Sequence, residues 1–315
     1  MIQISGRKLA ASLFIATSLV IGSPSAVMAG PKDKKPEVQE IASSSAMVFD
    51  LKHNRVIYSF NPDKIMPIAS VTKLMTAMVT LDAKQSMSEQ ISIETKSNPF
   101  LENEYSRVRV GSTLSRKEVM LLALMSSENR AASSLAEHYP GGYKAFIKAM
   151  NAKAKRLGMK NTHYEDPTGL SPNNVSTARD LTRLLVASRQ YPMLTELSTT
   201  VGKDVIFKKP TYRLHFANTN RLLRYDKDWK IALTKTGYTD EAGHCLVMRT
   251  YFKGVPVTTV TLNAYGKYTH FADAQRLRHY LETGESTKLP ESVVRYRDAR
   301  IREAAALESS VADGT

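Results

Sequence analysis

Apolar and polar positions alternate along residues 46–60, AMVFDLKHNRVIYSF, on both sides of a short polar triplet. A period of two is typical of a half-buried strand, and two such runs around a polar turn predict a β-hairpin. From position 70 onward, SVTKLMTAMVTL is apolar on most sides. That pattern predicts a helix buried in the interior of the protein.

Helical periodicity dominates the middle of the chain. SRKEVMLLALM opens with Ser115 and Glu118 at the spacing of a capping box, which predicts the start of a buried helix. YKAFIKAMNAKAKRLG predicts a helix ending at Gly158, and STARDLTRLLVASRQ predicts another that begins with Ser176 or Thr177 as its N-cap. Between these two segments, NTHYEDPTGLSPNN is rich in turn residues and predicts a loop.

Strand-like patterns return after Asn218. WKIALTKTGYT predicts a strand, DEAG a turn, and HCLVMRTYFKGVPVTTVTLNA two strands joined at Lys253-Gly254, before HFADAQRLRHYLE closes as a helix. Strands, then helices, then strands and a helix predict a mixed α/β fold. We expect a mostly antiparallel sheet flanked by helices, with a mostly helical subdomain inserted at about residues 90–200.

The first 29 residues have the three-part layout of a secretory signal. Arg7 and Lys8 precede an apolar run, and Ala26 and Ala29 stand at the small-residue positions of a cleavage site. We expect cleavage after Ala29 and export. Removing this segment lowers the formal charge from +14 to +12 and leaves 286 of the 315 residues.

Composition restricts the remaining possibilities. The cations are dispersed among 30 acidic residues, a pattern that favours a solvated basic surface over a nucleic-acid interface. Cys245 is the single cysteine, so no internal disulfide forms, and its strand-like surroundings predict a packing role. The histidines lack metal-ligand spacing, and we expect neither a metal nor a cofactor. Residues 30–42 predict a flexible leader, and residues 284–315 a charged tail without a firm membrane anchor.

Chemistry is suggested first by Ser70-Val-Thr-Lys73 at the start of the buried helix. Serine is a poor nucleophile until a base takes its proton, and a lysine in an apolar site loses its own proton readily. Positions three apart share a helix face. Because Ser5-Gly-Arg-Lys8 matches the same spacing, the pattern alone also fits the polar face of an ordinary helix.

Two further motifs strengthen the case for an active site. Ser127-Glu-Asn129 follows a buried helix, which can hold a hydroxyl and a carboxamide rigidly. Lys235-Thr-Gly237 lies within a predicted strand, where a cation and a hydroxyl suit a carboxylate and glycine admits a close approach. Ser171-Pro-Asn173 is a second match to the first of these motifs.

These three motifs, in this order, resemble the set shared by serine penicillin-binding proteins and β-lactamases. KTGYTDEAG and DPTGLSPNNVSTARDL are similar to segments of the small serine D-alanyl-D-alanine peptidases, and the resemblance spans about residues 43–283. It implies a β-lactamase/D,D-peptidase-like fold. The short C-terminus resembles that of periplasmic endopeptidases that cut peptidoglycan cross-links. Their carboxypeptidase relatives usually add a C-terminal β domain and an anchoring helix. Peptidoglycan as substrate and β-lactams as covalent inhibitors follow from the same resemblance.

The resemblance also implies catalytic roles. Ser70 would be the nucleophile that forms an acyl-enzyme, Lys73 the general base, and Ser127 the relay of a proton to the leaving amine. The backbone N–H groups of Ser70 and Tyr238 would form the oxyanion hole.

Substrate binding is implied for the remaining motif positions. Asn129 would position the amide of the acyl donor, while Lys235 and Thr236 would hold the substrate carboxylate beside Gly237. Glu128 departs from the Gly or Asp that relatives often carry between the serine and the asparagine. It either tunes substrate choice or faces solvent.

Three alternatives stay open. A carboxypeptidase would use the same motifs. A class A β-lactamase needs a glutamate that activates the deacylating water, and Glu165 and Asp166 lie in a suitable loop, although EDPTGLSPNN lacks that family's glutamate-to-asparagine pattern. A sensor or scaffold without catalysis would bind β-lactams and cleave no peptide.

Overall fold

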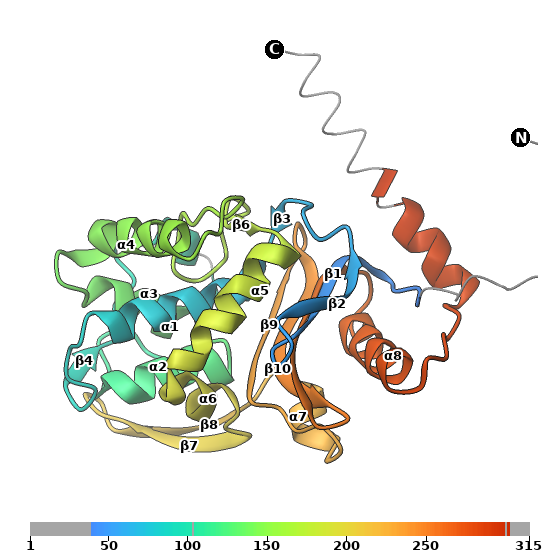
Figure 1. Ribbon diagram of the computed structural model, residues 1–315. Helices are drawn as coiled ribbons and strands as arrows, with labels where there is room; N and C mark the ends of the chain where they lie inside the picture. The colour runs from blue at the N-terminus through green and yellow to red at the C-terminus, as the bar shows by residue number, and fades with distance from the viewer. Residues whose placement is uncertain (1–38, 103, 300, 303–315) are drawn as a thin grey trace, which may run out of the picture. The chain divides into compact units, whose positions relative to one another are not determined.

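A five-stranded antiparallel sheet forms the centre of the protein. The computed structural model describes residues 39–102, 104–299 and 301–302. The strands lie in the order β2-β1-β11-β10-β9; β1, β2, β9 and β10 are labelled in Figure 1. Their bounds are Ser43–Asp50 (β1), Arg55–Phe60 (β2), Leu233–Thr239 (β9), Gly243–Phe252 (β10) and Val255–Ala264 (β11). The first described strand therefore pairs with the last described one, and β9 is left at an edge of the sheet.

Both predicted hairpins are confirmed. β1 pairs with β2, and β10 pairs with β11 through a turn at Lys253 and Gly254. Both turn residues have positive φ, 46° and 78°, a backbone conformation that glycine adopts without strain. The antiparallel mixed α/β architecture expected from the sequence is therefore present.

Apolar side chains cover both faces of the sheet because successive strand residues point to opposite sides. On one face, Val48, Leu246 and Met248 pack with the helix α8 (Thr269–Thr283). On the other face, neighbouring residues such as Val247 and Val260 belong to a larger core shared with the remaining helices. Figure 1 shows α8 on one side of the sheet and the helical body on the other.

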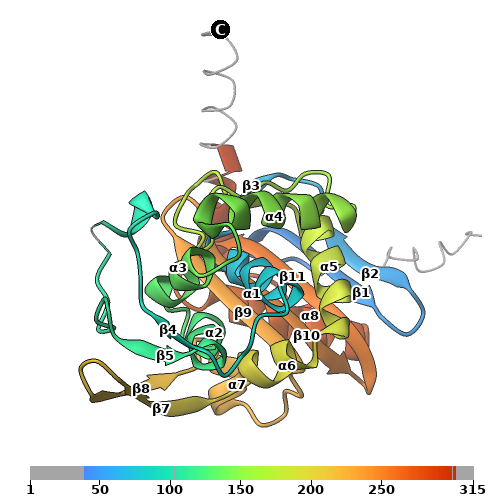
Figure 2. The same cartoon turned by 90° about the vertical axis from the view of Figure 1, so that its left-hand side faces the viewer.

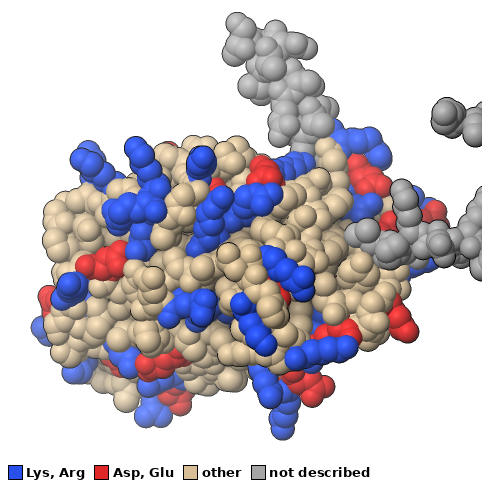
Figure 3. All heavy atoms as spheres, viewed as in Figure 1, with Lys and Arg blue, Asp and Glu red and all other residues tan. Residues whose placement is uncertain are grey.

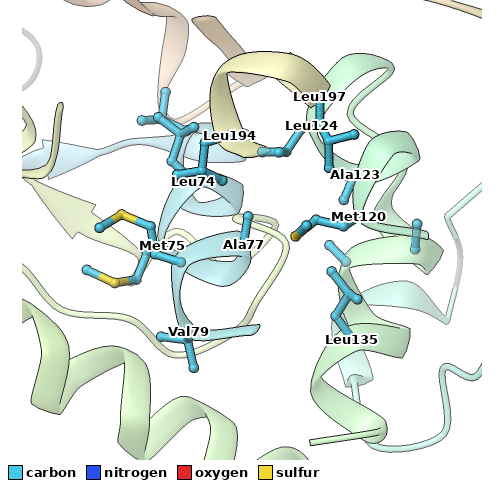
Figure 4. Packing of buried hydrophobic residues seen from close by; sticks show 14 of the residues in the cluster. Leu74, Met75, Ala77, Val79, Met120, Ala123, Leu124, Leu135, Leu194 and Leu197 are labelled. Atoms are coloured by element: carbon cyan, nitrogen blue, oxygen red, sulfur yellow. The ribbon is translucent and has the colours of Figure 1, made fainter. Parts of the chain in front are cut away.

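The helical body is built around one buried helix, α1 (Lys73–Asp82). Residues 73–80 of α1 are all buried, as its nearly continuous apolar sequence predicts. Figure 4 shows α1 side chains among those of α2, α3 and α6. The surrounding helices are Arg116–Met125 (α2), Asn129–Glu137 (α3), Gly142–Arg156 (α4), Ala178–Ala187 (α5) and Pro192–Ser198 (α6).

Capping residues begin two of these helices where the sequence predicts. Ser115 and Glu118 form the reciprocal capping box of α2. Thr177, rather than Ser176, caps α5 by accepting a hydrogen bond from the backbone N–H of Asp180. These local signals fix the helix starts that orient the buried faces.

Short elements complete the described fold. They are the 3-10 turns η1 (Ala69–Thr72), η2 (Pro99–Leu101) and η3 (Ser188–Gln190), the helix α7 (Arg221–Tyr225), and the strand pairs β3 (Met66–Pro67) with β6 (Val175–Ser176), β4 (Gln90–Ser92) with β5 (Thr113–Ser115), and β7 (Gly202–Phe207) with β8 (Tyr212–Ala217). The β7–β8 hairpin, visible beside α2 in Figure 2, was not predicted. Its sequence carries many cations, and only Val205, Phe207 and Phe216 are buried, so the apolar signal is weak.

The ends of the described fold lie against each other. Gln39 exchanges hydrogen bonds with the backbone of Thr287, and Arg297 donates to the carbonyl oxygen of Ile41 at 2.8 Å. Residues 39–42 are therefore packed, although the sequence placed them in a flexible leader. Residues 291–299 of the charged tail are helical. The signal and the leader up to residue 38 lie outside the described residues. Among the helices that are described, none is long and apolar enough to cross a membrane.

Candidate active site

Ser70 lies in the 3-10 turn η1, directly before α1 begins at Lys73. The preceding residue, Ala69, has a φ of 47°, a left-handed conformation that costs a non-glycine residue about 1 kcal/mol or more. The surrounding core must hold this turn, because η1 packs against β9 and β10 of the sheet. The serine side chain is thereby presented at a fixed point between the sheet and the helical body.

Lys73 is wholly buried and its Nζ atom has three partners. The distances are 2.7 Å to Ser70 Oγ, 2.7 Å to Asn129 Oδ1 and 2.7 Å to the carbonyl oxygen of Thr168. Burial lowers the pKa of Lys73 to about 7, against the opposing attraction of Asp166, Glu128 and Glu104. A neutral amine donates two hydrogen bonds and keeps one lone pair. Such an amine can donate to the two carbonyl oxygens and accept the proton of Ser70.

The turn between α2 and α3 supplies Ser127 and Asn129. Ser127 has a φ of 62°, and its Oγ atom accepts a hydrogen bond of 2.8 Å from Lys235 Nζ. Asn129 is the first residue of α3, and its amide nitrogen lies 3.4 Å from Glu104 Oε2. Within this motif, Ser127 therefore contacts Lys235, whereas Asn129 contacts Lys73.

Glu128 makes two hydrogen bonds that the sequence did not predict. Its carboxylate caps α3 by accepting from the backbone N–H of Arg130, and it also accepts from the hydroxyl of Ser106 at 2.8 Å. The side chain thus fixes the turn that carries the serine and the asparagine.

The edge strand β9 carries Lys235, Thr236 and Gly237. Lys235 is 1% exposed, and burial, with Lys73 nearby, lowers its pKa well below the usual value. The Thr236 hydroxyl donates to the hydroxyl of Thr219 at 2.6 Å. A Cβ atom at Gly237 would lie 3.0 Å from the backbone nitrogen of Ser70. Glycine therefore allows β9 to approach the nucleophile closely.

Gly169 closes the other side of the nucleophile turn. Its φ is 84°, and a Cβ atom would stand 1.9 Å from the carbonyl oxygen of Ala69. Glycine is required there both for the backbone conformation and for the contact.

The motif residues border one cleft. Its volume is about 890 Å³, and its lining includes Ser70, Ser127, Asn129, Thr236, Gly237 and Tyr238. Lys73 and Lys235 do not line the cleft but lie behind it, each bonded to one of the serine hydroxyls. The three sequence motifs are therefore brought together, with hydroxyls in front and buried amines behind.

The loop containing Glu165 and Asp166 positions the site. Asp166 is fully buried, and its carboxylate accepts from the backbone N–H groups of Thr168 and Gly169 at 3.1 and 2.9 Å. Glu165 binds Ser171 and Asn173 within the same loop. The loop thus directs the carbonyl oxygen of Thr168 at Lys73. The sequence marked this segment as a loop but did not predict that contact.

Other matches from the sequence do not join this site. Ser171 and Asn173 hold their own loop, Ser5 and Lys8 lie outside the described residues, and Cys245 is buried in β10 without a disulfide. No group of His, Cys, Asp and Glu side chains within the described part of the chain is arranged to hold a metal ion.

The fold is similar to that of a solved penicillin-binding protein. The penicillin-binding protein D2 of Listeria monocytogenes, solved in its cefotaxime-bound form, is 28% identical, with a TM-score of 0.66 over 77% of this chain and 98% of that one. The expected β-lactamase/D,D-peptidase-like fold is confirmed by this similarity.

Sequence relatives identify the family to which the chain belongs. The D-alanyl-D-alanine carboxypeptidase family matches residues 32–266. The D-alanyl-D-alanine endopeptidase of Pseudomonas aeruginosa is 58% identical, covering 93% of this chain and 92% of its own. The enzyme of that name from Escherichia coli K12 is 58% identical over 85% and 86%. This chain belongs to the D-alanyl-D-alanine carboxypeptidase family of peptidases, which are hydrolases.

Proposed function

We propose that this protein is a serine D,D-peptidase that hydrolyses D-alanyl cross-links of peptidoglycan and that penicillins acylate at Ser70. The single observation that carries the proposal is the pair formed by Ser70 and Lys73. Their side chains are 2.7 Å apart, in a site where burial brings the pKa of Lys73 to about 7. A base with that pKa is half neutral at neutral pH and can take a proton from serine.

The acylation step follows from this geometry. Ser70 Oγ forms a bond to the carbonyl carbon of a D-alanine while its proton moves to Lys73 Nζ. The C–N bond to the next residue then breaks, and the proton that Lys73 took up passes through the hydroxyl of Ser127 to the leaving nitrogen, which returns Lys73 to its neutral form. Water hydrolyses the resulting ester and restores the serine hydroxyl. The backbone N–H groups of Ser70 and Tyr238 would bind the oxyanion, an interaction whose loss costs on the order of 3 kcal/mol.

Lys235 and Thr236 would hold the carboxylate of the leaving residue. Lys235 is buried and, among the described residues, bonds hydroxyl and carbonyl oxygens, those of Ser127 and Thr236. Burial lowers its pKa, and an incoming carboxylate would favour the protonated form. Asn129, already bonded to Lys73, would use its amide nitrogen to orient the acyl donor.

Cross-links are the preferred substrate in this proposal because the relatives at 58% identity are named endopeptidases. The cleft of about 890 Å³ also offers more space than a terminal D-alanine requires. Export to the periplasm is part of the same proposal, since peptidoglycan lies outside the cytoplasm. It is tested by sequencing the N-terminus of the protein recovered from a periplasmic fraction, which should begin at Gly30.

The experiment is mass spectrometry on the purified mature protein. The protein is incubated with cross-linked muropeptide dimers and, separately, with penicillin, beside a Ser70→Ala control. Conversion of dimers to monomers and a stable penicilloyl adduct on Ser70, both lost in the control, would support the proposal.

Other outcomes assign other functions. Loss of only a terminal D-alanine would indicate a carboxypeptidase, and rapid turnover of penicillin a β-lactamase. An adduct without any cleavage would indicate a sensor or scaffold. The absence of an adduct would remove Ser70 as the nucleophile.

A further inference from the structure

Buried cations in the described chain fall into two groups. Arg116 and Lys153 each have an acidic partner at 2.6 Å, Glu89 and Asp82 respectively. Lys73, Lys235 and Arg249 form no ion pair with any described carboxylate. Two of these three lie behind the candidate active site, so Arg249 is the one that the proposed chemistry leaves unexplained.

Arg249 is incompletely satisfied within the protein. It lies in β10 and is 9% exposed. Its Nη2 atom donates to Thr195 Oγ1 at 2.7 Å and to the carbonyl oxygen of Ala232 at 3.4 Å. Its Nε atom is enclosed and has no acceptor. Burying a charged group without full hydrogen bonding is costly, and the desolvation lowers the pKa of Arg249, with Arg189 adding repulsion.

A separate cavity of about 550 Å³ opens at Arg249. It is lined by residues from β10 and β11, from the β1–β2 turn, from α6 and the segment before it, and from the residue that precedes β9. The polar lining consists of Arg189, Thr195, Arg249, Thr250 and Tyr251, and no acidic residue borders the cavity. Two guanidinium groups therefore border a space that no acidic residue lines. The hydroxyl of Thr195 already accepts from Arg249, and that of Thr250 donates to the carbonyl oxygen of Lys230.

The face of the molecule that carries α5 and α6 is also basic. Figure 3 shows that Lys and Arg predominate over Asp and Glu at the centre of the face on which α5 and α6 lie in Figure 1. A positive field of this kind raises the local concentration of anions.

We propose that the cavity at Arg249 is an oxyanion-binding site, separate from the candidate active site, that takes one carboxylate or phosphate group. Guanidinium groups match the planar, two-oxygen geometry of both anions. A bound oxyanion would neutralise the buried guanidinium and pair with Arg189 at the mouth. Unlike the candidate active site, this cavity is lined by no serine or lysine.

The test observes Arg249 directly by nuclear magnetic resonance. Enclosure of the Nε–H group slows its exchange with water, so the ¹H–¹⁵N signal is observable, and it is assigned by its loss in Arg249→Met or, if that variant does not fold, in Arg249→Lys. The mature protein is titrated with inorganic phosphate and, separately, with acetate, at constant ionic strength set with sodium chloride. Because the signal belongs to Arg249, anions that bind near Lys73 or Lys235 are not mistaken for this site.

We expect the Arg249 signal to shift saturably with at least one oxyanion and not with chloride. Phosphate alone would identify a phosphoryl source, and acetate alone a carboxylate source. Arg189→Gln should weaken binding by about five-fold, the effect of one partly exposed charge pair, whereas Arg224→Gln on α7 should leave it unchanged. The proposal would be overturned by a signal that does not move or that drifts equally with chloride. It would also be overturned if Arg189→Gln bound the oxyanion with unchanged affinity.

Discussion

The rate at which penicillin acylates Ser70 should follow the ionisation of Lys73. With a pKa of about 7 for Lys73, about half of the molecules carry a neutral amine at pH 7. A lysine of ordinary pKa would be neutral in only about one molecule in two thousand, so burial raises the competent fraction on the order of a thousand-fold. The protonated amine accepts no proton. The rate should therefore fall about ten-fold per pH unit well below pH 7 and reach a plateau above about pH 8.

Asn129→Asp changes that ionisation with little change in shape. The new carboxylate would lie where Asn129 Oδ1 now stands, 2.7 Å from Lys73 Nζ. An opposite charge at this distance raises the pKa of a lysine by roughly 1–3 units. The midpoint of the pH profile should move upward by that amount. The plateau reached at high pH should be lower than in the unmodified protein, because the amide nitrogen that orients the acyl donor is lost. Asn54→Asp, at an exposed hairpin turn, adds the same charge away from the site and should leave the midpoint unchanged.

The assay is the second-order rate constant for penicilloyl-protein formation, measured by mass spectrometry of quenched samples between pH 5 and 10. A rate that is independent of pH between 5 and 8 would refute Lys73 as the base. So would an Asn129→Asp profile whose midpoint coincides with that of the unmodified protein.

Three further predictions test the supports of the site. Gly169→Ala should slow acylation about a hundred-fold, the cost of a displacement of about 1 Å at a reacting group, because its Cβ would stand 1.9 Å from a backbone oxygen. Gly158→Ala, also at positive φ but with its nearest neighbour 4.0 Å away, should acylate normally, and equal rates would contradict the steric reasoning. Asp166→Asn should lower the free energy of unfolding in urea by about 1–3 kcal/mol, because the carboxylate that accepts from backbone N–H groups is lost. It should also shift the midpoint of the acylation pH profile to lower pH, since Asp166 raises the pKa of Lys73. An unmoved midpoint would show that the charge of Asp166 does not act on Lys73. Leu124 is 1% exposed in the core, and Leu124→Ala should lower the free energy of unfolding in urea by about 2–5 kcal/mol. One penicillin per chain should still bind. A loss of less than 1 kcal/mol would show that neighbouring side chains fill the cavity left by the substitution.

Local sequence signals determined much of the fold. The capping box of Ser115 and Glu118 fixes the start of α2, and the alternation over 46–60 specifies the β1–β2 hairpin. These signals act over a few residues, through backbone hydrogen bonds and side-chain period, and are therefore readable without the tertiary structure. The β7–β8 hairpin was not found because Val205, Phe207 and Phe216 are the only buried residues in these two strands, which leaves little of the apolar pattern that marks a strand.

The candidate motifs were also readable from the sequence, because the i, i+3 spacing of Ser70 and Lys73 brings both side chains to one face of a turn. Only the tertiary structure brings Asn129 and the carbonyl oxygen of Thr168 to Lys73, across separations of 56 and 95 residues. The shifted pKa of Lys73 depends on that enclosure, since burial is its main cause.

The burial of Arg249 is likewise visible in the tertiary structure and not in the sequence. In the sequence it is one cation among 44 lysines and arginines, within a segment that reads as a strand. The folded structure buries it beside Thr195 and, within the residues that are described, gives it no acidic partner. Sequence period therefore determined which elements form, whereas the desolvation of charged groups, which depends on everything packed around them, was decided by the tertiary structure alone.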